Sequence, residues 1–166
     1  MKYLIKTYSN FDDELLKYWK NLERSAFFHP FQSLSWIKSW YDFIGNPNKI
    51  TPCIVIVLID ENPQMIIPLG LKSNLGIKVV DFLASEQSDY SAPIMNREFI
   101  YNESSFLVLW KDIINLIPKF DILKIKNIPK LINEKCNPMY PIGIYSEERS
   151  YYLKIDSKDY DQFSKN

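Results

Sequence analysis

Apolar residues follow a two-residue or a near-continuous pattern in several short stretches of the chain, and these stretches predict β-strands. Residues 2–8 alternate loosely between apolar and polar. Three apolar, β-branched stretches follow at residues 52–59, 65–71 and 77–83, separated by turn residues at 60–63 and by Asn74-Leu75-Gly76. Short turns between successive strands predict an antiparallel meander. Residues 121–126 and 150–155 predict two further strands.

A helical period appears in three other segments. The first predicted helix begins after Asn10 and places Leu15, Trp19, Leu22 and Ala26 on one face. The second begins near Ser33 or Ser35 and ends at Gly45, with Trp36, Ile37, Trp40 and Ile44 on its apolar face. The third covers residues 103–117 and is stopped by Pro118. Its apolar face comprises Phe106, Leu109, Trp110, Ile113 and Ile117.

The order of these elements predicts an α/β (α+β) fold, because a mixed sheet with helices on its faces would cover every apolar stripe. Pro68 has no backbone donor, so we expect it at a sheet edge or a bulge. Residues 128–141 are expected to be irregular. The last residues, 157–166, have the pattern of a helix that is beginning, with acidic residues near its start. We therefore expect a domain over residues 1–155 and the start of a connecting helix over residues 156–166.

Composition narrows the classes of function. The chain has 166 residues, 20 basic and 20 acidic, so it has no net charge that would favour nucleic acid or an anionic membrane. The longest apolar stretch, residues 54–59, is far shorter than the roughly 20 residues of a transmembrane segment. Cys53 and Cys136 show no ligand or redox spacing, so we expect reduced thiols and a cytoplasmic location.

Candidate catalytic residues are few. His29 is the single histidine, which leaves metal binding and nucleophilic triads poorly supported. With four glycines, the chain contains no glycine-rich phosphate-binding loop. Glu86 and Asp89 lie in the polar stretch after a predicted strand, beside Tyr90, and could bind a polar substrate or, as a weaker alternative, act as a hydrolytic pair. All four tryptophans lie on helical apolar faces, where we expect them in the core.

Five short motifs, in order along the chain, resemble those of a known bacterial family. They are Phe31-Gln-Ser-Leu-Ser-Trp36 preceded by His29-Pro30; Met65-Ile-Ile-Pro-Leu69; Gly76-Ile-Lys78 leading to Phe82-Leu83; Asp89-Tyr90-Ser-Ala-Pro93; and Ser164-Lys165-Asn166. In this order they resemble the N-terminal half of the CelD-like acetyltransferase-like proteins, which are related to FemAB-type aminoacyltransferases in the GNAT superfamily.

The resemblance implies a GNAT-like mixed sheet with an antiparallel meander and flanking helices. It also implies acyl transfer to an amine or hydroxyl, with acyl-CoA (acetyl-CoA) as donor, in cell-surface polysaccharide or cell-wall biosynthesis. The acceptor would be a small molecule or a glycan precursor. The donor-binding glycine loop of the family is missing here, so we expect that loop in a second GNAT-like half and assign no cofactor-binding residue to this chain.

Asp89 and Tyr90, with Glu86, are the residues we expect to line the acceptor cleft. No catalytic residue can be named from the sequence. The missing donor loop keeps a second interpretation open: a non-catalytic binding or interaction domain that reuses the fold.

Overall fold

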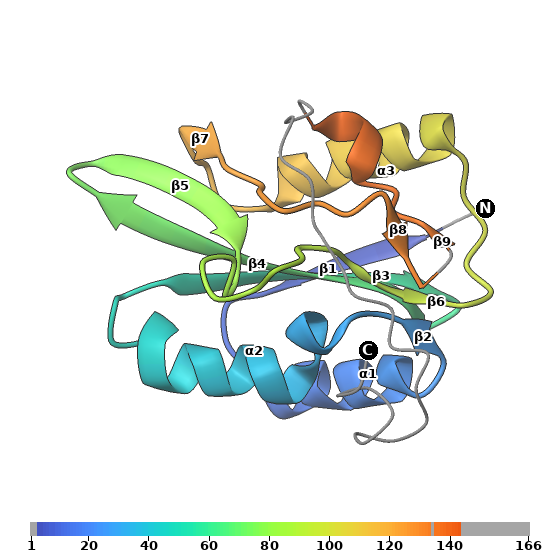
Figure 1. Ribbon diagram of the computed structural model, residues 1–166, viewed down its shortest axis with the longest axis horizontal. Helices are drawn as coiled ribbons and strands as arrows, with labels where there is room; N and C mark the ends of the chain where they lie inside the picture. The colour runs from blue at the N-terminus through green and yellow to red at the C-terminus, as the bar shows by residue number, and fades with distance from the viewer. Residues whose placement is uncertain (1–2, 134, 144–166) are drawn as a thin grey trace, which may run out of the picture.

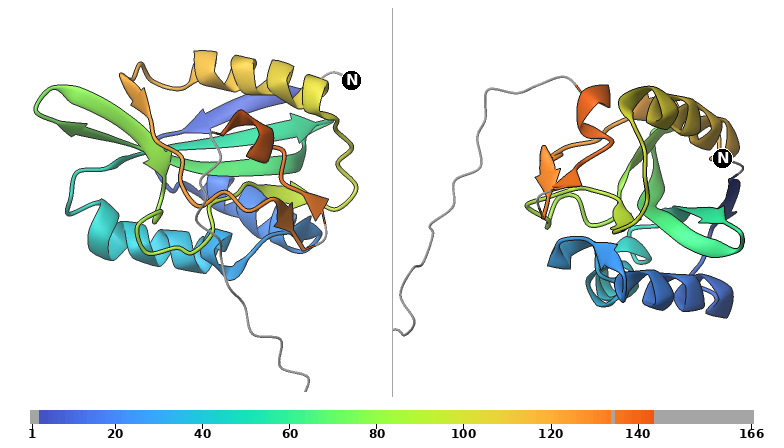
Figure 2. Two further views of the ribbon diagram at one scale, coloured as in Figure 1. Left: turned by 45° about the horizontal axis from the view of Figure 1, so that its top comes forward. Right: turned by 90° about the vertical axis from the view of Figure 1, so that its right-hand side faces the viewer.

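The computed structural model describes residues 3–133 and 135–143, and in these residues a mixed sheet lies between two layers of helix (Figures 1 and 2). The sheet order is β1-β3-β4-β5-β7, with β6 beside β4 and β2 beside β6. Its strands are β1 (Leu4–Tyr8), β2 (Ala26–Phe27), β3 (Thr51–Ile59), β4 (Asn62–Asn74), β5 (Ile77–Phe82), β6 (Ile94–Asn96) and β7 (Ile122–Leu123). The predicted α/β class is confirmed.

The meander formed by β3, β4 and β5 is antiparallel throughout, as predicted. Ile56 of β3 pairs with Ile66 of β4, and Leu71 of β4 pairs with Val80 of β5. One pair, β5 with β7, is parallel. A parallel pair needs a crossover connection, and the segment between these two strands contains α3 (Glu103–Leu116).

The helices begin where a side chain can accept the first free backbone N–H groups. α1 (Asp13–Glu23) starts after Asp12, whose Oδ1 accepts from the Leu15 N–H at 2.9 Å, so the predicted start at Asn10 is too early. α2 (Leu34–Trp40) follows Ser33, and α3 follows Asn102. Ala26, expected on the first helix, instead lies in β2, because α1 ends at Glu23.

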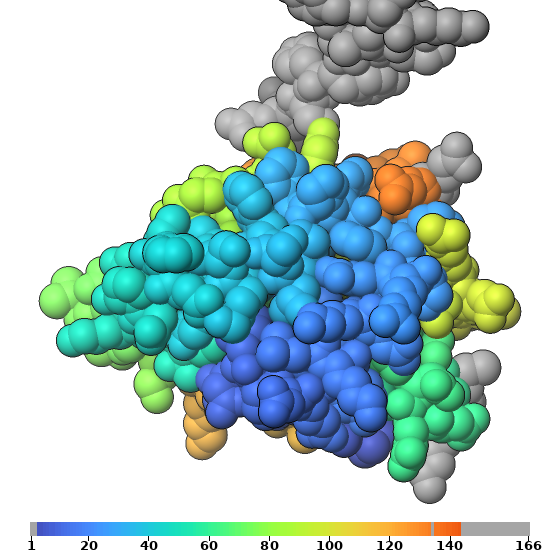
Figure 3. Space-filling model, turned by 90° about the horizontal axis from the view of Figure 1, so that it is seen from below, coloured from blue at the N-terminus to red at the C-terminus, as the bar shows by residue number. Residues whose placement is uncertain are grey.

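The sheet is buried on both faces. In β3, Ile54, Ile56 and Leu58 pack with α1 and α2 in one core, whereas Val55 and Val57 pack with α3 in the other. Successive side chains of a strand point to opposite faces, so this alternation sends consecutive apolar residues into different cores. Figure 1 shows the result, with α1 and α2 below the sheet and α3 above it, and in Figure 3 the blue and cyan residues of the α1 and α2 layer cover most of the lower face.

Pro68 lies in an interior strand rather than at an edge of the sheet. However, β4 changes partner at this point, since its pairing with β5 ends at Leu69 and its pairing with β6 covers Met65 and Ile66. The Pro68 carbonyl accepts from the Leu83 N–H at 2.8 Å, and its nitrogen faces the gap on the same side. No ladder hydrogen bond is therefore lost at the proline.

The second helix ends differently from the prediction. Instead of a glycine cap, a π-helical turn covers Tyr41–Gly45. A Cβ at Gly45 would lie 2.8 Å from Cζ3 of Trp40, so this glycine allows close packing against the tryptophan ring. The wider turn continues the helical segment through residue 45.

The segment after α3 has less regular structure. The strand predicted at residues 121–126 is reduced to β7, and the expected irregular region contains the hairpin of β8 (Leu131–Ile132) and β9 (Lys135–Cys136). The strand predicted at residues 150–155 and the helix predicted from residue 157 lie outside the described residues. None of the helices in residues 3–133 and 135–143 is long and apolar enough to cross a membrane.

We predict that Leu75→Asn stabilises the protein by about 1 kcal/mol. Leu75 and Gly76 form the β4–β5 turn with φ of 50° and 83°, and Leu75 is 96% exposed, so its side chain gains no packing in return for a left-handed backbone. Asparagine adopts this conformation more readily than leucine. Urea unfolding measures the change. Leu75→Val is the matched control and should destabilise; equal stability of the two variants would contradict the prediction.

We also predict that the two thiols differ sharply in reactivity. Cys53 lies in the core, and burial raises its pKa to about 11, whereas Cys136 is exposed. The thiolate is the reactive form, so at pH 8 Cys53 would be ionised to only about one part in a thousand. Titration of the native protein with a chromogenic disulfide at pH 8 should show one fast thiol, and the second should react after denaturation. Two fast thiols would contradict this burial.

Candidate functional site

The segment between β5 and β6, residues 83–93, carries all three residues expected to bind substrate. Glu86 and Asp89 are exposed, and Tyr90 is half-buried. Glu86 lines a pocket on one side of this segment, whereas Asp89 and Tyr90 are not among the residues that line it. The structure therefore separates Glu86 from the other two rather than gathering all three in one cavity, and the hydrolytic pair gains no support.

Side chains from α2 and the turn before it fix the segment in place. The Trp36 Nε1–H donates to Ser88 Oγ at 3.2 Å, and the Trp40 Nε1–H donates to Gln87 Oε1 at 2.7 Å. Gln32, itself buried, donates from Nε2 to the Tyr90 carbonyl at 2.6 Å. Two of the motifs noted in the sequence, residues 31–36 and 89–93, therefore meet in space.

Trp36 is the tryptophan that the sequence pattern misplaced. Trp19 and Trp110 are buried as expected, and the half-buried Trp40 packs against the core of α1 and α2, but Trp36 is 38% exposed. Ile44, expected on the same face as Trp36 and Trp40, is also exposed. Helical spacing identifies a shared face, but it does not show whether the sheet or a loop covers that face.

Aromatic rings surround Tyr90. His29 stacks on it with ring centroids 4.8 Å apart, and the Phe31 centroid lies 6.3 Å away. Burial lowers the pKa of His29, so its imidazole is mainly neutral at pH 7. His29 is half-buried, and its ring packs against the segment that carries the candidate site.

The other side of the segment contacts the chain after β7. The Ser91 N–H donates to the Asn127 carbonyl at 2.8 Å, and Asn127 Nδ2 donates to the Ser88 carbonyl at 3.2 Å. Residues 83–93 are thus bound between α2, early in the chain, and residue 127, late in it. These polar contacts supply partners for backbone groups that the sheet no longer pairs.

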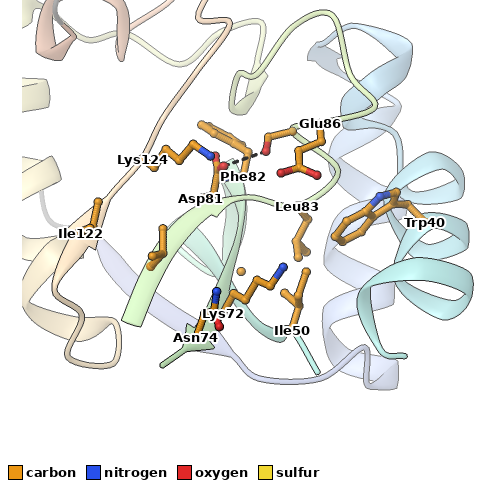
Figure 4. A pocket seen from close by; sticks show the side chains of 13 residues that line it. Trp40, Ile50, Lys72, Asn74, Asp81, Phe82, Leu83, Glu86, Ile122 and Lys124 are labelled. Atoms are coloured by element: carbon orange, nitrogen blue, oxygen red, sulfur yellow. Dashed lines mark hydrogen bonds between the residues drawn. The ribbon is translucent and has the colours of Figure 1, made fainter. Parts of the chain in front are cut away.

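A pocket of about 290 Å³ lies beside residues 83–93, over the part of β4, β5 and β7 that carries Gly70, Val79 and Ile122 (Figure 4). Its apolar lining includes Ile50, Val79, Leu83 and Ile122, and its charged lining consists of Lys72, Asp81, Glu86 and Lys124. Gly70 also lines the pocket. A Cβ at this position would lie 2.5 Å from Cδ2 of Leu83, so the absence of a side chain lets residues 83–93 approach β4.

Asp81 has the most perturbed carboxyl group of the pocket. Its Oδ2 accepts from Ser85 Oγ at 2.9 Å, and its Oδ1 accepts from the Phe82 N–H at 2.8 Å. Burial raises the pKa of Asp81, while these hydrogen bonds and the charges of Lys124 and Lys126 act in the opposite direction. A carboxyl group with a raised pKa is a better proton acceptor near neutral pH than an ordinary aspartate.

The sequence contained one usable signal for Asp81. It is the only acidic residue in the predicted strand of residues 77–83, on the same face as Ile77 and Val79. Lys72 and Lys124 gave no such signal, because lysines are common on exposed strand positions. Their convergence on one pocket depends on the pairing of β4, β5 and β7.

A second hollow, of about 680 Å³, lies between the end of α3 and β5. Its Asp121 carboxylate already accepts from the Lys78 N–H at 2.7 Å. In the described part of the chain, no group of three or more His, Cys, Asp or Glu residues is placed to hold a metal ion. We take the pocket at Asp81 and Glu86 as the candidate functional site, because it adjoins residues 83–93 and is lined by charged groups of both signs.

We predict that Trp36 and Ser88 are energetically coupled by about 0.5–1 kcal/mol, because Trp36→Phe and Ser88→Ala each remove one partner of the same hydrogen bond. Urea unfolding of both single variants and the double variant measures this coupling. The control cycle combines Trp110→Phe with Ser88→Ala. Trp110 belongs to α3 and lies in the core on that side of the sheet, so it should show no coupling to Ser88. Additive effects at Trp36 and Ser88 would contradict the proposed anchoring.

The chain was compared with models of protein families, with curated proteins and with solved structures, and none of them matches it. The site is therefore defined by its geometry: a segment anchored by Trp36, Trp40 and Gln32, beside a pocket with charges of both signs.

Proposed function

We propose that this chain is the N-terminal half of a bacterial GNAT-like acyltransferase, in which residues 83–93 and the pocket beside them shape the acceptor site. The observation that carries the proposal is the contact between two motifs of the resemblance. Trp36 and Gln32, from the first motif region, bind Ser88 and Tyr90 of the polar segment. The mixed sheet with its antiparallel meander and flanking helices agrees with the fold that the resemblance implies.

The pocket supplies groups that acyl transfer requires. A base must remove a proton from the attacking amine or hydroxyl, and hydrogen-bond donors must stabilise the oxyanion that forms. Asp81, whose pKa burial raises, and Glu86 are the carboxylates that can accept the proton. Lys72 and Lys124 are the donors that line the same pocket.

The donor, acetyl-CoA or another acyl-CoA, would bind mainly to a second half. Helix N-termini preceded by glycine-rich turns are the usual sites for phosphate groups. Here the longest helix, α3, follows Asn102, and the four glycines are at positions 45, 70, 76 and 143, away from that helix start. We keep cell-surface polysaccharide or cell-wall precursors as the proposed acceptor class and the cytoplasm as the proposed location.

A non-catalytic binding domain is the second candidate function. It is favoured by the pocket itself, whose charged groups of both signs suit recognition of a ligand without a donor site. In that case Asp81 and Glu86 recognise charge and transfer no proton. The two candidates differ in whether acetyl-CoA is ever bound by the gene product.

We predict that residues 1–166 alone do not bind acetyl-CoA in isothermal titration calorimetry. The reading frame beyond Asn166, if it encodes a second half, should give a longer protein that does bind it, because that half would carry the donor loop. A CoA-binding acetyltransferase titrated in parallel provides the positive control. Binding by residues 1–166 alone would overturn the division between acceptor and donor halves, and a longer protein that fails to bind would favour the binding-domain function.

A further inference from the structure

The four charged residues of the pocket do not neutralise one another through ion pairs. In the described part of the chain, the ion pairs are Lys6–Glu14 and Lys38–Asp42, neither of which lies in the pocket. The Asp81 carboxylate accepts hydrogen bonds from Ser85 and Phe82, and the side chains of Glu86 and Lys72 make no hydrogen bond to another described residue. Two acidic and two basic groups therefore line one pocket with capacity left to bind a ligand.

The positions of these charges follow from the strand register. Lys72, Val79 and Ile122 form one row across β4, β5 and β7, and Gly70 pairs with Asp81 in the next row. Glu86 lies on the segment above the sheet, and Figure 4 shows its side chain directed toward the pocket from the side opposite Lys72. Glu86 and Lys72 thus lie on different walls with an apolar surface between them, whereas the charge of Lys124 acts on Asp81 and lowers the pKa of that carboxyl group against the effect of burial.

Among the described residues, no helix covers this end of the sheet, so part of the apolar surface is exposed. The β4–β5 hairpin extends past α2 in Figure 1, and Ile122 beside it is 47% exposed. Val79 and Leu83 continue the surface into the pocket. A buried cavity of about 150 Å³ is large enough to bind benzene, so a pocket of about 290 Å³ can accept a ring with a short polar chain.

The charge balance selects among ligands. A simple cation would be attracted by Asp81 and Glu86 but repelled by Lys72 and Lys124, and a simple anion would meet the reverse. Nearby charges interact appreciably at a protein surface, where the effective dielectric constant is lower than in water. A ligand with one ammonium group and one anionic group satisfies both walls at once.

We infer that the pocket binds a small zwitterion with an apolar body, its ammonium group beside Glu86 and its anionic group beside Lys72. The interpretation of this zwitterion as the acyl acceptor rests on the function proposed above. The binding of a zwitterion is independent of that function, because binding is measured with no donor present. A longer gene product that binds the zwitterion but does not bind acetyl-CoA would leave this site intact while contradicting the acyltransferase.

Four probes that share one aromatic body test the inference: phenylalanine, 2-phenylethylamine, 3-phenylpropionate and 2-phenylethanol. They carry both charges, the positive charge, the negative charge and no charge, respectively. Calorimetry at pH 7 on the full chain should show phenylalanine binding at least about tenfold more tightly than each of the others, a difference of about 1.4 kcal/mol. Equal or tighter binding of a singly charged or neutral probe would overturn the inference, as would the absence of binding by all four at millimolar concentration.

Substitutions at two exposed residues of the pocket test which protein charge binds each charge of the ligand. In Glu86→Gln the affinity for phenylalanine should fall toward that for 3-phenylpropionate, whereas in Lys72→Met it should fall toward that for 2-phenylethylamine. Glu103→Gln and Lys111→Met, at exposed positions of α3, are the matched controls and should leave all four affinities unchanged. If Glu86→Gln and Lys72→Met bind phenylalanine as tightly as the original chain does, the assignment of the pocket is wrong.

Discussion

Burial of β3 and β4 on both faces is the constraint on which the rest of this structure depends. Their consecutive apolar side chains alternate between two cores, so each face of the sheet needs its own helical cover. α1 and α2 supply one cover and α3 supplies the other. The sheet extends beyond α1 and α2 at the β4–β5 hairpin, and the pocket that we assign as the functional site lies where this cover ends.

Much of this architecture could be predicted from local patterns. The apolar stretches of β3, β4 and β5 predicted the meander, and the apolar face of α3 predicted a helix whose buried residues are the expected ones. Local patterns failed where a distant segment decides the environment. Trp36 lies at a helical position suited to the core, but its indole donates to Ser88, 52 residues away, at the surface.

The candidate site was also predicted only in part from local sequence patterns. Glu86 was found because polar residues after a strand often form sites, and it does line the pocket. Asp81, Lys72 and Lys124 were missed because their convergence follows from the pairing of three strands, which no single stretch of sequence encodes. Asp89 and Tyr90, predicted with Glu86, do not line this pocket, and the Tyr90 ring packs against His29.

The contacts of residues 83–93 also bear on the order in which the molecule folds. Ser88 is bonded to Trp36, 52 residues before it, and to Asn127, 39 residues after it. Contacts between residues so far apart in sequence close large loops, which costs more entropy than a local contact does, so we expect them to form after local elements such as α2. The arrangement of residues 83–93 depends on segments that precede and follow it by dozens of residues, so the site is a product of the tertiary structure and not of its own stretch of chain.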